Sequence, residues 1–248
     1  MRRDDPGAHR AVDVLRAAQA AAAAGSPAVV ATLLDPPDAA RRAAFAADGS
    51  ILAGALPDGL REPVREAVSA ALASDRSGTV EVAGREVFLE IVAPAPRLVV
   101  LGAGPASEPL VEMAASCGFD VVVADPRPAF AEASRFPGAV EVLVGWPEDL
   151  EGRLRIDERT FVVSLLHDER FEGPMLPMVL DSPARYIGAM GSRRTHAKRL
   201  ERLAGQGYAD AAERIHGPVG IDIGAETPAE IAVAILAEVI SVRRAVSS

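Results

Sequence analysis

The fold of this chain is decided by residues 97–127, RLVVLGAGPASEPLVEMAASCGFDVVVADPR. Leu98–Leu101 is a short apolar run of the kind found in strands that are buried on both faces. Two glycines follow it at once, then apolar residues at helical spacing, and then a second apolar strand that ends on Asp125. Strand, glycine turn, helix and strand in this order predict a Rossmann-like βαβ unit.

The glycine turn indicates a phosphate site. A backbone that turns tightly or approaches a phosphate closely needs residues without a Cβ, and Gly102 and Gly104 meet that need. Ser107 replaces the third glycine of the dinucleotide-binding pattern, and we expect it to cap the following helix. Asp125 lies roughly 20 residues beyond the glycines, where such units place a ribose-binding carboxylate. The sequence therefore predicts nucleotide binding here, with the alternative that the glycines only close the βαβ unit.

The composition limits the possible classes of function. The chain has 248 residues, and its net charge of −9 argues against nonspecific DNA or RNA binding, which needs clustered positive charge. No apolar run reaches the length of a membrane span, and the charged start lacks the apolar region of a signal peptide, so we expect a cytoplasmic protein. The single cysteine, Cys117, excludes an internal disulfide and a cysteine metal cluster. We expect its side chain to be buried on the apolar face of its helix.

Two domains are expected. Residues 1–93 read as a small α+β domain with helices, a strand and two hairpins, and a short proline-rich linker follows. Residues 97–248 alternate strands and helices, which predicts a Rossmann-like, doubly wound and mostly parallel sheet. Besides the central unit, we expect helices at 12–24, 60–73, 174–180, 193–204 and 228–246, and strands at 28–34, 43–47, 51–55, 79–82, 86–92, 140–144, 161–166 and 185–187.

Ligands of such sheets bind at the carboxyl ends of the strands, near the point where the strand order reverses. Four predicted strand ends carry glycines or polar side chains, and their convergence is the strongest functional signal in the sequence. From three of them come the candidate cofactor-binding residues Gly102, Gly104, Pro105, Ser107, Asp125, Arg127, Gly188, Gly191, Ser192, Arg193 and Arg194. The fourth end carries the candidate catalytic residues His167 and Asp168.

The segment after Gly191 fits an anion. Backbone N–H groups, Ser192 and two arginines stand together at a predicted helix start, which suits a phosphate or a carboxylate. The alternative is a solvated basic helix face, to which we assign Lys198 and Arg199.

His167 follows an apolar strand and precedes an acid. It suits a general base, a hydrogen-bond donor to a ligand or a metal ligand, with the alternative of a strand-end histidine satisfied by backbone. Histidines and cysteines at metal-ligand spacing do not accompany it, so we assign no metal site.

Four segments together resemble the xanthine dehydrogenase accessory proteins, the XdhC/CoxI family. They are GAGPASEPLVEMAASCGFDVVVADPRPAF (102–130), RFPGAVEV (135–142), YIGAMGSRRTHAKRLERL (186–203) and GPVGIDIGAETPAEIAVAILAEVISVRR (217–244). The resemblance implies a Rossmann-like C-terminal domain, a homodimer and a maturation factor for molybdenum hydroxylases of the xanthine dehydrogenase or carbon monoxide dehydrogenase type. Such a factor binds the molybdenum cofactor (molybdopterin), protects it during sulfuration by a cysteine desulfurase, and helps to insert it into the apo-enzyme.

The chain departs from the family pattern at several positions. Gly25-Ser26-Pro27-Ala28 keeps only part of a GSxPR-like motif, and Leu56-Pro57-Asp58-Gly59 has no cysteine where many members carry Gly-Gly-Cys. Pro105 replaces a common histidine, and Leu166 replaces a common threonine. The N-terminal motifs are therefore degenerate, while those of the C-terminal domain are largely kept.

Three functions remain open. The first is a molybdenum-cofactor chaperone, as the resemblance implies. The second is an NAD(P)-dependent oxidoreductase, as the glycine turn and Asp125 alone would suggest, although the sequence lacks a tyrosine–lysine pair at helical spacing. The third is a module that senses a nucleotide without turning it over.

Overall fold

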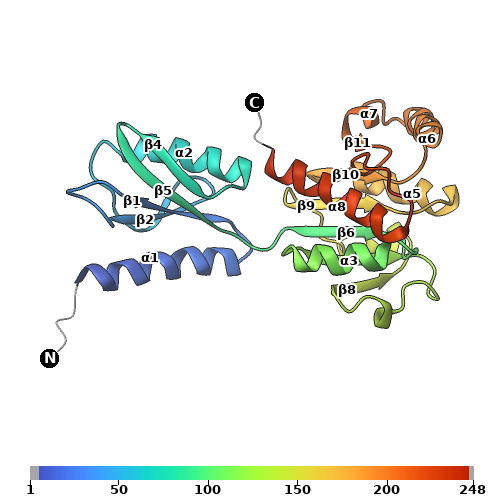
Figure 1. The fold of residues 1–248 in the computed structure, drawn as a ribbon, viewed down its shortest axis with the longest axis horizontal. Helices are drawn as coiled ribbons and strands as arrows, with labels where there is room; N and C mark the ends of the chain where they lie inside the picture. Colours follow the sequence, from blue (N-terminus) through green and yellow to red (C-terminus); the bar gives the residue numbers. More distant parts are fainter. Residues whose placement is uncertain (1–5, 246–248) are drawn as a thin grey trace. The chain divides into compact units, whose positions relative to one another are not determined.

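The computed structural model describes residues 6–245, which form two compact units. One unit contains residues 6–94 with 243–245, and the other is Ala95–Val242, so the boundary lies in the expected linker (Figure 1). The expected outer domain limits at 1 and 248, and the predicted helix end at Val246, lie outside the described residues.

The first unit is a five-stranded antiparallel sheet with a helix on each face. The strands are β1 (Ala28–Leu33), β2 (Arg42–Ala46), β3 (Ile51–Gly54), β4 (Gly78–Val82) and β5 (Arg85–Val92), in the order β3-β2-β1-β5-β4. Successive residues of β1 belong to opposite clusters: Val30 packs with residues of α1 (Pro6–Ala23), and Val29 packs with residues of α2 (Arg61–Ser74). A strand that is apolar on both faces requires this double cover, and both predicted hairpins are present.

The second unit is a six-stranded sheet in the order β11-β10-β9-β6-β7-β8, and every pair is parallel. The strands are β6 (Arg97–Leu101), β7 (Asp120–Asp125), β8 (Ala139–Val144), β9 (Thr160–Ser164), β10 (Tyr186–Ala189) and β11 (Ile215–His216). The order reverses between β6 and β9, so the glycine turn after β6 lies at the switch point of the sheet. The predicted Rossmann-like class is confirmed.

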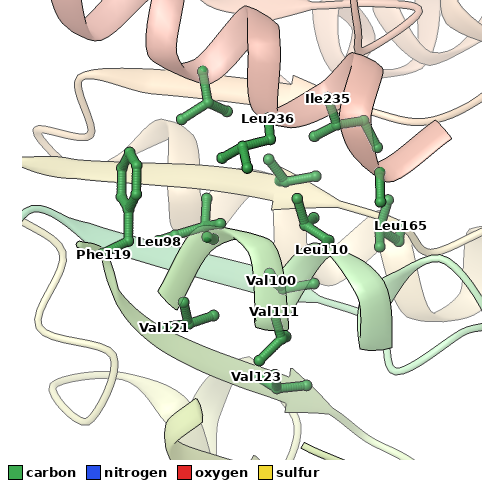
Figure 2. Packing of buried hydrophobic residues seen from close by; sticks show 14 of the residues in the cluster. Leu98, Val100, Leu110, Val111, Phe119, Val121, Val123, Leu165, Ile235 and Leu236 are labelled. Atoms are coloured by element: carbon green, nitrogen blue, oxygen red, sulfur yellow. The ribbon is translucent and has the colours of Figure 1, made fainter. Parts of the chain in front are cut away.

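Helices cover both faces of this sheet. They are α3 (Ser107–Ser116), α4 (Pro147–Leu150), α5 (Glu169–Leu180), α6 (Arg193–Gly205), α7 (Ala211–Arg214) and α8 (Pro228–Arg244), and a 3₁₀ turn spans Ala133–Arg135. Figure 2 shows one face, where the even residues of β6 and the odd residues of β7 pack against α3 and α8. The odd residues of β6 face a second core with side chains of α5 and α6. Alternation along buried strands thus divides the core into two layers.

Several local predictions were wrong. β9 ends at Ser164 rather than Leu166, and α5 begins at Glu169 rather than at 174 because Asp168 caps it. Cys117 is exposed, since it is the C-cap residue of α3 and has left the apolar face of the helix. No helix within residues 6–245 is both long and apolar enough to cross a membrane.

Candidate functional site

The two glycines of the turn after β6 serve different purposes. Gly102 has a φ of 101°, and a Cβ built there would lie 3.1 Å from the backbone nitrogen of Leu166, so the fold itself requires this glycine. Gly104 lies outside the left-handed region, and its ideal Cβ would have nothing within 4 Å. The chain therefore gives no steric reason for glycine at position 104, and the space before it is open.

Ser107 stabilises this turn through two hydrogen bonds to the backbone. It is fully buried, and both its hydroxyl and its backbone N–H donate to the carbonyl of Gly104. The prediction that Ser107 caps α3 was wrong, because the N-cap is Ala106 and Ser107 already lies in the first turn. Within the described residues, the N–H groups of Gly104 and Ala106 have no hydrogen-bond acceptor, while the exposed Pro105 between them has no N–H to offer. Free N–H groups at a helix start beside an open space suit an anion.

Asp125 lies at the end of β7, as predicted, but its carboxylate is already fully engaged. Its side chain is buried, and one oxygen accepts from the backbone N–H of Ala103 at 2.8 Å and from Nη2 of Arg127 at 2.7 Å. The other oxygen accepts from the backbone N–H and Nε of Arg127 at 2.9 and 2.8 Å. A carboxylate offers about four acceptor positions, so this one holds the turn and Arg127 in place instead of presenting a free oxygen to a ribose.

The ionisation of this pair follows from the same contacts. Burial alone would raise the pKa of Asp125, but the hydrogen bonds from Arg127 and from the Ala103 N–H outweigh it and hold that pKa below its usual value. In turn, Asp125 raises the pKa of Arg127. The two side chains therefore form a stable ion pair at the switch point.

Aromatic side chains surround Arg127, and sequence reasoning missed them. Its guanidinium lies 4.0 Å from the ring centroid of Phe130 and 5.2 Å from that of Phe171. The rings of Phe171 and Trp146 are 5.5 Å apart at an interplanar angle of 40°. These residues follow the ends of three strands, β7, β8 and β9, so only the folded sheet brings them together. We call Arg127, Phe130, Trp146 and Phe171 the aromatic cluster.

The two candidate catalytic residues do not form a pair. Asp168 is the N-cap of α5, and its carboxylate accepts from the backbone N–H of Arg170 and from its Nε, both at 3.0 Å. The hydrogen bonds from the Arg170 side chain and then from its backbone lower the pKa of Asp168 to about 2. His167 is exposed in the β9–α5 loop, and its ring has no hydrogen bond in the part of the chain that the structure describes. His167 is thus available to a ligand, whereas Asp168 mainly starts a helix.

The segment after β10 separates into packing residues and exposed residues. A Cβ on Gly188 would lie 2.5 Å from Val219, and Gly191 has a φ of 139°, so packing and backbone geometry explain both glycines. Ser192 caps α6 by accepting from the N–H of Thr195 at 3.1 Å. Arg193 and Arg194 are exposed at the start of that helix, where a positive side chain and the helix N-terminus both favour an anion.

Arg199 was expected on a solvated face, and this was wrong. It is 2% exposed, and its Nε and Nη2 donate to Oε1 of Glu172 at 3.0 and 2.7 Å. Nη2 also donates to the carbonyl of Met190 at 2.6 Å, and Arg202 lies 3.4 Å from the other oxygen of Glu172. The buried pair therefore fixes the β10–α6 loop to α5. Among the residues whose side chains the structure describes, no group of three or more His, Cys, Asp or Glu could hold a metal ion.

Comparisons with known proteins identify the family of the second unit. Residues 98–239 match the XdhC Rossmann domain family. The chain is 34% identical over 161 residues to a probable xanthine dehydrogenase subunit from Bacillus subtilis strain 168, which covers 65% of this chain and 47% of that protein. It is 32% identical over 151 residues to the molybdenum cofactor insertion chaperone PaoD of Escherichia coli K12, which covers 60% of this chain and 41% of that protein.

A solved structure extends the similarity to both units. The crystal structure of a xanthine dehydrogenase from Bacillus halodurans has a TM-score of 0.69 and 26% sequence identity, over 90% of this chain and 61% of that one. The chain spans less than half the length of the curated relatives from Bacillus subtilis and Escherichia coli.

Proposed function

Because the chain belongs to the XdhC family, we propose that it binds the molybdenum cofactor and serves as an insertion chaperone for a molybdenum hydroxylase. The observation that carries the proposal is the open space before Gly104, beside the unpaired N–H groups at the start of α3. A phosphate could approach the backbone closely at that point, and the molybdenum cofactor carries one. In this account the cofactor is the cargo of the protein.

Polar groups at this edge of the sheet would then hold the cargo. The N–H groups of Gly104 and Ala106 would bind the phosphate, and Arg193 and Arg194 would add positive charge at the start of α6. The ring of His167, which has no partner within residues 6–245, would bond to the heteroaromatic part of the ligand. None of these groups requires the chain to carry out a chemical step on the cofactor.

The proposal extends to partners. The client would be an apo-hydroxylase of the xanthine dehydrogenase or carbon monoxide dehydrogenase type, which this chain would meet in the cytoplasm as a homodimer. The only cysteine is Cys117, in the second unit, and the N-terminal unit has none. We therefore assign the sulfur for cofactor sulfuration to a separate cysteine desulfurase.

The alternatives are an NAD(P)-dependent oxidoreductase and a nucleotide-sensing module. An NAD site needs a free carboxylate oxygen for the ribose at the end of the second strand. Asp125 has both oxygens bound to Ala103 and Arg127, which works against a site for NAD.

The test is to purify the protein from a host grown with molybdate and to identify what it carries. We expect a pterin that converts on oxidation to a fluorescent product, in amounts that Gly104→Val lowers. We expect no oxidation of NADH with small carbonyl acceptors. A protein that carries an adenine dinucleotide and no pterin would contradict the proposal.

A further inference from the structure

We propose that Trp146 and Phe171, in the aromatic cluster, form the surface on which the planar heteroaromatic ring of the ligand stacks. This inference rests on the proposed function, because it places the ring of a ligand whose phosphate lies at the glycine turn. It assigns specificity to residues that neither the Rossmann pattern nor the family motifs in the sequence singled out.

A short chain of contacts joins the aromatic cluster to the phosphate site. Asp125 accepts from the Ala103 N–H of the glycine turn at 2.8 Å and from Arg127 at 2.7 Å with the same oxygen. The guanidinium of Arg127 lies 5.2 Å from the ring centroid of Phe171, and that centroid lies 5.5 Å from the ring of Trp146. Direct contacts through Asp125, Arg127 and Phe171 thus link the glycine turn to Trp146.

Two rings of the aromatic cluster, Trp146 and Phe130, are exposed, and Phe171 beside them is half-buried. Trp146 is 38% exposed and Phe130 is 41% exposed, whereas Phe136, Phe161 and Tyr186 of the same unit are at most 2% exposed. An exposed aromatic ring next to a guanidinium at a strand end provides the flat surface on which heteroaromatic bases stack. The rings that this unit leaves exposed thus lie at the edge of the sheet where its ligand is expected.

The charges near the rings indicate which part of the ligand lies there. Arg127 is paired with Asp125, and Arg170 is paired with Asp168. Asp149 adds a carboxylate that accepts from the backbone N–H of Trp146 at 3.2 Å. The cations near the cluster are thus paired and a further anion lies beside Trp146, so the aromatic cluster suits a neutral planar ring rather than a phosphate. The anionic part of the ligand is left to the glycine turn and to the arginines of α6. A pterin and an adenine both meet this description, and the test separates them.

The test measures affinity by calorimetry, with molybdopterin, NADP and inorganic pyrophosphate as probes. Trp146→Leu keeps an apolar side chain but removes the ring, and Trp146→Phe keeps a ring. Base stacking on an aromatic side chain is worth about 1–3 kcal/mol, so we expect Trp146→Leu to lower the affinity for the ring-bearing ligand roughly 5- to 150-fold. We expect Trp146→Phe to lose much less affinity for that ligand, and we expect pyrophosphate to bind all variants with equal affinity. Phe88→Leu is the matched control, because Phe88 is 37% exposed and lies in the other unit.

A second measurement uses Trp146 as its own reporter, since it is the only tryptophan of the chain. Saturating ring-bearing ligand should quench its fluorescence, and pyrophosphate should not. Unchanged affinity in a folded Trp146→Leu protein, or saturation without quenching, would overturn the inference.

The results separate this inference from the proposed function. If molybdopterin binds equally well with and without the Trp146 ring, the inference fails and the proposed function stands. If NADP binds in a Trp146-dependent way and molybdopterin does not bind, the inference stands and the proposed function fails. If neither ring-bearing ligand binds the wild type, both fail.

Discussion

Substitution of Gly104 tests whether the open space at the glycine turn belongs to a ligand. An alanine Cβ there would meet nothing within 4 Å, and the backbone lies outside the left-handed region. Gly→Ala at such a position raises the free energy of unfolding by about 0.4–1 kcal/mol, because it restricts the unfolded chain. For a chain of this size we expect the melting temperature to rise by no more than about 2–4 °C.

The effect on binding should be opposite in sign. A side chain at position 104 occupies the space that a phosphate needs to reach the backbone N–H groups. Loss of a charged hydrogen bond costs about 1.5–3 kcal/mol, so we expect Gly104→Ala to weaken ligand binding roughly 10- to 150-fold. Gly104→Val, with its branched side chain, should abolish binding while the protein stays folded.

Gly102 supplies the matched control. Its φ is 101°, and its Cβ would lie 3.1 Å from the backbone of Leu166, so Gly102→Ala should lose stability by about 1–2 kcal/mol or more. Calorimetric titration and thermal denaturation of the two alanine variants should therefore separate a binding glycine from a folding glycine. Unchanged affinity in Gly104→Val, for whichever ligand binds the wild type, would remove the turn from the site. If Gly104→Ala lost as much stability as Gly102→Ala, the statement that a Cβ at position 104 meets no other atom would be refuted.

Three further predictions concern the charged residues of the site. The pKa of Asp125 is lowered in the folded state, so its contribution to stability is present above its unfolded pKa and is lost as pH falls through the folded value. Between about pH 6 and pH 2, urea denaturation should therefore show a smaller loss of stability for Asp125→Asn than for the wild type. An equal loss in both proteins would contradict this. Arg193→Ala should weaken binding of an anionic ligand more than Arg194→Ala, because Arg193 is nearer the helix start; equal and negligible losses in titrations would assign both to a solvated face. Arg199→Met should lower the free energy of unfolding by about 3–5 kcal/mol, because it leaves Glu172 buried without its main partner; denaturation curves showing a loss below about 1 kcal/mol would contradict a buried pair.

The strands and helices were predictable where apolar residues repeat at the spacing of a strand or a helix. The apolar runs of β6 and β7 and the turn between them determine the βαβ unit, and the capping box at Thr227 and Glu230 gives the start of α8 correctly. Short elements carry no such signal. Neither α4 nor the two-residue β11 has enough residues to show a period, and the structure alone reveals them.

The places of the candidate residues in the fold were predictable, but their contacts were not. The sequence predicted Gly104 and His167 beyond the ends of two parallel strands, and they follow β6 and β9. The partners of Asp125 and Asp168 depend on where Arg127 and Arg170 direct their side chains, which spacing does not show. Burial of Arg199 likewise depends on contacts between distant segments, since Glu172 stands 27 positions earlier in the chain.

We propose that this protein delivers the molybdenum cofactor to a molybdenum hydroxylase. The most direct test is reconstitution of an apo-hydroxylase with molybdenum cofactor and a cysteine desulfurase, with and without this protein. We predict that wild type raises hydroxylase activity, that His167→Ala reduces the gain, and that omission of the desulfurase leaves activation incomplete. No gain from wild type, together with oxidation of NADH by the protein alone, would contradict the chaperone account and support a dehydrogenase.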